Sequence, residues 1–161
     1  MTATQAEMIV KYYADLAGQQ RAIVRERMEL DAQYCPLRGN APDGMPHAAT
    51  NGDTTADAAL KLADTDVARR LRELDVREEV LKSDKAAIRA ALDRLNSRHK
   101  ELLAMRYIDG HTWEYTAWRV GLSRRQAIRV NTVALTRAGA VLEDMPQAGE
   151  ILARARDACA L

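Results

Sequence analysis

Apolar side chains recur every seven residues along two long stretches of the chain. In the first stretch, about 4–34, the repeat consists of Ile9, Leu16, Ile23 and Leu30. In the second, about 54–95, it runs without exception through Leu60, Val67, Leu74, Leu81, Ile88 and Leu95. A seven-residue spacing held this long predicts left-handed supercoiling of one helix against another. The simplest arrangement is an antiparallel coiled-coil hairpin made by these two helices.

Local signals mark the start of each long helix and the character of its seam. Thr4 with Glu7, and Thr54 with Asp57, have the spacing of N-terminal capping signatures. The positions four residues after each member of the repeat hold both aromatic and polar side chains. In the first stretch they are Tyr13, Gln20, Arg27 and Tyr34. We therefore expect a seam that is partly solvated.

The segment between the two helices, 35–53, has a different composition. It holds three of the four prolines and three of the eight glycines, namely Pro36, Pro42, Pro46, Gly39, Gly44 and Gly52. Proline removes helix donors and glycine frees the backbone, so this segment is predicted to be a loop.

Three shorter helices are predicted after a break at Asn96 and Ser97. The first covers about 98–108 and ends at Asp109 and Gly110. The second covers 113–120, with Thr112 as its N-cap and Gly121 after its end. The third begins at Ser123, where Ser123 and Gln126 form a capping box, and continues to Ala138 or beyond. A weak last helix is expected near Ile151.

The composition favours an all-α fold. Phe is absent and aromatic residues make up only 4% of the chain, which leaves aliphatic seams as the main source of buried surface. We expect a coiled-coil hairpin over 1–95, a helix-turn-helix domain over 96–145 and a tail over 146–161.

The second and third short helices have the skeleton of a helix-turn-helix, because a tight turn containing Gly121 joins them. Gly121 is expected to have a positive φ, and Ala117 is small enough for two helices to cross. The expected core consists of Leu102, Met105, Trp113, Leu122, Val130, Ala134 and Leu135, with Thr116 also pointing inward. The expected DNA-binding residues are Ser123, Arg124, Arg125, Gln126, Ile128, Arg129 and Thr132.

Charge is unevenly distributed along the chain. The formal net charge is only +1, but residues 97–137 contain eight basic and three acidic residues. This segment therefore carries +5 and the remainder −4, which favours a basic surface that binds a polyanion such as double-stranded DNA.

Other function classes find little support in the sequence. His47, His99 and His111 are scattered, and Cys35 and Cys159 lack metal-site spacing, so we expect no metal and no cofactor. No phosphate-binding loop or catalytic triad pattern is visible, so an enzyme is not expected. No apolar run has the length of a membrane helix, and we expect a cytoplasmic protein without a membrane partner.

The segments 102–110 (LLAMRYIDG), 112–114 (TWE) and 120–126 (VGLSRRQ), together with Ala117, resemble region 4 of bacterial sigma factors. They are especially similar to the sigma-like domain of phage and prophage regulators of the ArpU and RinA type. The segments 44–47 (GMPH) and 52–54 (GDT) resemble the upstream part of those regulators. The resemblance implies a phage-encoded transcription regulator that binds DNA through Arg124, Arg125, Ile128 and Arg129, with RNA polymerase as a further partner.

Two alternatives remain open at this stage. A phage DNA-packaging protein of the small-terminase kind also joins a helix-turn-helix to helical oligomerisation parts. A coiled-coil adaptor that has lost DNA binding would show the same heptads. Self-association through the coiled coil is compatible with all three hypotheses.

Overall fold

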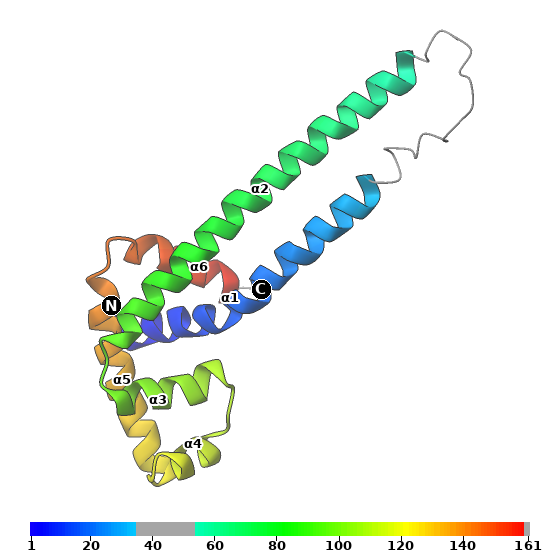
Figure 1. Cartoon of the computed structure of the whole chain (residues 1–161). Helices are drawn as coiled ribbons and strands as arrows, with labels where there is room; N and C mark the ends of the chain where they lie inside the picture. Colours follow the sequence, from blue (N-terminus) through cyan, green and yellow to red (C-terminus); the bar gives the residue numbers. More distant parts are fainter. Residues whose placement is uncertain (35–53, 160–161) are drawn as a thin grey trace. The chain divides into compact units, whose positions relative to one another are not determined.

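The computed structural model describes residues 1–34 and 54–159, with side chains described for 1–32 and 65–159. Every regular element in these stretches is helical, which confirms the all-α class. The elements, shown in Figure 1, are α1 (Ala3–Tyr34), α2 (Thr54–Asp93), α3 (Ser97–Leu103), the π-helix η1 (Ala104–Ile108), α4 (Trp113–Arg119), α5 (Arg124–Glu143) and α6 (Ala148–Cys159). The predicted loop at 35–53 lies outside the described residues.

The chain divides into two compact units. Unit 1 contains Met1–Gly18 and Leu81–Leu161, and unit 2 contains Gln19–Val80. The boundary therefore falls inside α1 and α2, and the segments 1–95, 96–145 and 146–161 expected from the sequence do not coincide with the units. The physical reason is that a seven-residue repeat looks the same whether its helix faces one neighbour or several.

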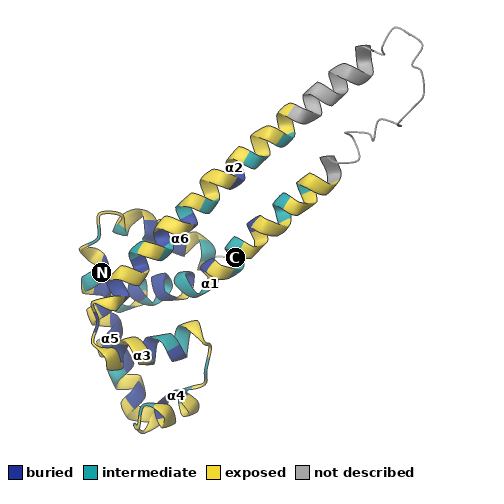
Figure 2. Ribbon diagram, viewed as in Figure 1, coloured by how far each residue is buried: buried dark blue, intermediate teal, exposed yellow. Residues whose placement is uncertain are grey.

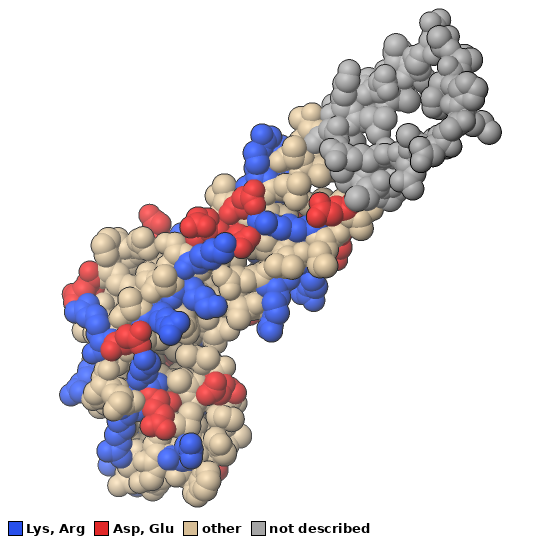
Figure 3. All heavy atoms as spheres, in the orientation of Figure 1, with Lys and Arg blue, Asp and Glu red and all other residues tan. Residues whose placement is uncertain are grey.

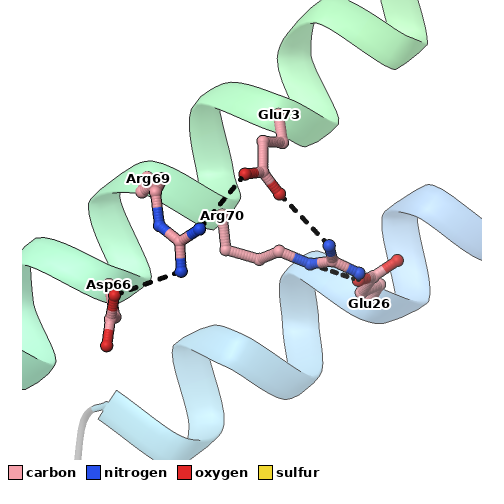
Figure 4. A network of polar contacts seen from close by, with 5 residues as sticks. All are labelled: Glu26, Asp66, Arg69, Arg70 and Glu73. Atoms are coloured by element: carbon pink, nitrogen blue, oxygen red, sulfur yellow. Dashed lines mark hydrogen bonds and ion pairs between the residues drawn. The ribbon is translucent and has the colours of Figure 1, made fainter.

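In unit 2, α1 and α2 lie side by side, with Ile23 and Leu74 buried between them. Ion pairs flank this seam, and Figure 4 shows Arg70 of α2 donating to Glu26 of α1 at 2.9 Å. Arg27 of α1 pairs with Glu78 of α2 at 2.8 Å. Partly solvated pairs of this kind contribute on the order of 1 kcal/mol or less each, so we expect the apolar seam to supply most of the stability of unit 2.

In unit 1, the heptad positions of α1 and α2 belong to a core that also includes residues of other helices. Ile9, Leu16, Leu81 and Ile88 are all buried, as the repeat predicted. Figure 2 shows further buried positions along α5, and α6 contributes Ile151, which is fully buried. The expected last helix is therefore present and belongs to the core of unit 1.

A buried polar cluster links three helices of unit 1. Asp84 of α2 is only 1% exposed and accepts from the Tyr12 hydroxyl of α1 at 2.9 Å. The Arg154 guanidinium of α6 donates to both Asp84 carboxylate oxygens, each at 2.8 Å. Burial and the hydrogen bond to Asp84 raise the pKa of Tyr12 to about 12. The Asp84 carboxylate can be buried because Arg154 and Tyr12 satisfy its oxygens.

The start of α1 differs from the prediction. Thr2 and Gln5 form the reciprocal contacts of a capping box, with Thr2 Oγ1 accepting from the Gln5 N–H at 3.2 Å and Gln5 Oε1 accepting from the Thr2 N–H at 2.9 Å. The predicted box of Thr4 and Glu7 is wrong, since Glu7 already lies inside the helix and pairs with Lys11 at 2.8 Å. Two overlapping matches to the pattern exist, and the helix begins at the earlier one. The side chains of the second predicted signature, Thr54 and Asp57, lie outside the described set.

The surroundings of His99 predict that the stability of unit 1 depends on pH. Its side chain is buried in α3, and the pKa of His99 is lowered by burial first and by the charges of Arg137 and Arg98 second. Because folding favours the neutral imidazole, the contribution of His99 to stability is complete above about pH 6.5 and is lost as the pH falls below that value.

We expect thermal melting of the wild type to show a larger drop between about pH 7.5 and 5.5 than melting of His99→Met, which cannot titrate there. For each protein, the quantity compared is the change in melting temperature between the two pH values. A packing effect of the substitution that does not depend on pH therefore cancels. Equal drops in both proteins would show that His99 carries no acid-linked destabilisation.

Candidate nucleic-acid interface

Helices α4 and α5 are joined by a tight turn whose geometry follows from Gly121. Gly121 has φ +66°, as predicted, a conformation that disfavours residues with a Cβ. The Gly121 N–H donates to the Trp118 carbonyl at 3.2 Å, and the Leu122 N–H donates to the Ala117 carbonyl at 2.9 Å. These bonds close the C-terminus of α4 and redirect the chain at once into α5.

The start of α5 is fixed by a capping box, as the sequence predicted. Ser123 Oγ accepts from the Gln126 N–H at 3.3 Å, and Gln126 Oε1 accepts from the Ser123 N–H at 2.9 Å. Thr112 caps α4 in a similar way by accepting from the Tyr115 N–H at 3.3 Å. The helical phase of α5, and hence which residues point outward, is therefore defined from its first turn.

The core between α5 and the helices that precede it packs largely as expected. Most of the predicted core residues are buried, namely Leu102, Met105, Thr116, Ala117, Ala134 and Leu135. Leu122, Val130 and Trp113 are half-buried. The Thr116 hydroxyl is satisfied because it donates to the Thr112 carbonyl at 2.9 Å. Helix α5 is thus held by α3 and α4, with its opposite face in contact with solvent.

All seven residues predicted to bind DNA are exposed, namely Ser123, Arg124, Arg125, Gln126, Ile128, Arg129 and Thr132. Helix α5 contains no acidic residue before Glu143. Within the described part of the chain, Arg125 and Arg129 have no carboxylate partner, so their guanidinium groups are available to an anion. On the side of the molecule shown in Figure 3, Lys and Arg side chains are interspersed with Asp and Glu side chains.

Arg124 differs from the other two arginines. Its Nε lies 3.1 Å from a carboxylate oxygen of Glu114, on the first turn of α4, and both side chains are about two-thirds exposed. Sequence reasoning missed this pair, because ten positions separate the two residues and only the path of the turn brings them together. The Glu114 carboxylate therefore competes with any new anionic partner of Arg124.

Tyr115 and Trp118 are exposed aromatic residues of α4, and the half-buried ring of His111 lies next to Tyr115. Sequence reasoning did not single them out. The rings of His111 and Tyr115 lie 4.3 Å apart, and those of Tyr115 and Trp118 lie 5.9 Å apart. Trp118 is 72% exposed. Trp113 behaves differently, since Arg106 stacks over its ring at 4.9 Å and ties η1 to α4.

Comparisons of the chain with protein-family models, with curated proteins and with solved structures gave no match. Across 1–34 and 54–159, no helix is both long and apolar enough to cross a bilayer. The same residues contain no group of three or more His, Cys, Asp or Glu side chains arranged to hold a metal ion.

Proposed function

We propose that this protein is a phage or prophage transcription regulator that reads the major groove of double-stranded DNA with α5. In this proposal α4 and α5 are the helix-turn-helix, α3 supports them, and the paired parts of α1 and α2 form a coiled-coil hairpin. The observation that carries the proposal is the exposure of Arg125 and Arg129, without a carboxylate partner, on a helix whose start is fixed by Ser123.

The geometry suits what a recognition helix must do. Arginine presents a planar fork that can bind guanine O6 and N7 together, and it also binds phosphate. In the helix-turn-helix mode, the first turns of the second helix enter the groove while the preceding helix crosses the backbone. The long acid-free part of α5 avoids repulsion along that path. The step from DNA binding to transcription, with RNA polymerase as a further partner, rests on the resemblance of 102–126 to sigma region 4.

Binding to a fluorescent random-sequence duplex, measured as a function of salt, tests DNA binding as such. Each neutralised phosphate contributes about −0.9 to the slope of log K against log salt, so several arginine contacts predict a slope of about −2 to −4. Absence of binding at low salt would instead support the adaptor hypothesis.

The Glu114–Arg124 pair predicts a gain of function. Glu114→Gln removes an acidic group beside the proposed DNA-binding surface and releases Arg124, so affinity for any duplex should rise by about two- to fivefold at low salt. The matched control is Glu101→Gln, which makes the same charge change at an exposed position of α3. If both variants bind like the wild type, or both gain equally, the pair has no specific effect on the site.

A further inference from the structure

Ile128 is an exposed aliphatic residue whose exposed neighbours on the first turns of α5 are polar. It is 41% exposed on α5, between Arg125 and Arg129 in the sequence. Core packing does not account for the exposed part of Ile128, although Ile128 lies at the edge of the buried face of α5, seven residues before buried Leu135. Helix propensity does not account for it either, since β-branched residues are weaker helix formers than many polar ones.

The neighbours of Ile128 form a row along one edge of α5. Arg124 lies four residues before it and Thr132 four residues after it, which places all three on the same side of the helix. The Thr132 hydroxyl donates to the Ile128 carbonyl at 3.3 Å. With its hydroxyl hydrogen used within the helix, Thr132 has a methyl group and an acceptor left for a partner. The row thus begins with a guanidinium and continues with aliphatic groups.

In the major groove, one base carries an apolar group that such a row can contact. Thymine presents its C5-methyl beside its O4 acceptor, whereas guanine presents the acceptors that suit arginine. Resting on the proposed function, we infer that Ile128 is a specificity-determining residue that contacts a thymine C5-methyl, next to the base pair contacted by Arg124 or Arg125. The bound site therefore contains a required thymine at one position.

A protein partner fits this surface less well. Val133 is the other large apolar residue exposed on α5, at 47%, but it follows Ile128 by five residues and therefore lies about 140° around the helix. Ile128 and Val133 do not form one patch, and Arg124, Arg125 and Arg129 lie within four positions of Ile128 along α5. An isolated aliphatic side chain next to arginines suits a thymine methyl group, which lies in the major groove between phosphate backbones.

The test replaces each thymine of a duplex selected by the wild-type protein with deoxyuridine, one position at a time. Deoxyuridine lacks only the C5-methyl, so base pairing is preserved. We expect one position where the wild type loses about three- to fivefold in affinity, the effect of one buried methyl. In Ile128→Ala, that position should show no difference between thymine and deoxyuridine. Val133→Ala, which shortens the other exposed aliphatic residue of α5, should keep the full wild-type difference.

The outcomes separate this inference from the function on which it rests. Selective duplex binding in which deoxyuridine has no effect, or the same effect in wild type and Ile128→Ala, overturns the inference and leaves DNA recognition by α5 intact. If the wild type selects no duplex at all, the proposed function is overturned and the inference with it.

Discussion

Replacing Arg154 with methionine should lower the free energy of unfolding by about 2 to 3 kcal/mol. The substitution leaves the Asp84 carboxylate buried with only the Tyr12 hydroxyl as partner. Removing one member of a fully buried ion pair costs roughly 3 to 5 kcal/mol. The loss expected here is smaller than that range because the Arg154 side chain is one-third exposed. Urea unfolding followed by circular dichroism measures the change.

Two further variants show whether the loss comes from the unpaired carboxylate. Arg156→Met, an exposed arginine two positions later on α6, should unfold like the wild type. The double variant Asp84→Leu with Arg154→Met removes both charges and should recover most of the stability, because apolar replacements of buried ion pairs are often neutral. If Arg154→Met unfolds at the wild-type urea concentration, the cluster of Tyr12, Asp84 and Arg154 does not stabilise unit 1.

The largest expected effect on function follows removal of the three arginines of α5. The triple variant Arg124→Ala, Arg125→Ala and Arg129→Ala should lose at least about 100-fold in affinity for the preferred duplex, since each well-placed arginine contributes roughly 1 to 3 kcal/mol. Its melting temperature should stay close to that of the wild type because all three side chains are exposed. Fluorescence anisotropy and thermal melting measure the two quantities.

The single variants separate base reading from phosphate contact. If Arg124 or Arg125 reads a base, its alanine variant relaxes specificity at one position. If Arg129 contacts phosphate, Arg129→Ala weakens binding to all sequences alike and reduces the salt slope by about one unit. A control with Arg21, Arg25 and Arg77 replaced by alanine makes the same charge change in unit 2 and should keep most of the affinity. Wild-type affinity in the α5 triple variant would show that α5 is not the recognition helix.

Much of the helical architecture could be predicted because its signals are local. The seven-residue repeat predicted the burial of Ile9, Leu16, Leu74 and Ile88, since burial of an aliphatic stripe follows directly from helical periodicity. The starts of α4 and α5 were predicted for the same reason. A cap needs only one side chain and a backbone N–H three residues on, as at Ser123.

Features that depend on which helices meet could not be predicted. The burial of Asp84 depends on Arg154, seventy residues later, and the sequence gives no sign of that contact. The pair of Glu114 and Arg124 depends on the path of the turn. The 98–108 helix was predicted, but its division into α3 and the π-helix η1 was not, because it depends on small shifts in backbone hydrogen bonding. The sequence alone does not distinguish the exposed aromatic residues Tyr115 and Trp118 from aromatic residues of a core.

Selection of bound sequences from a random duplex library is the most direct test of sequence-specific recognition by α5. The wild-type protein should enrich one defined motif that contains guanine and at least one fixed thymine, and the α5 triple arginine variant should enrich none. Recovery of sequences indistinguishable from the input library, at a salt concentration where the protein still binds, would contradict sequence-specific reading of DNA.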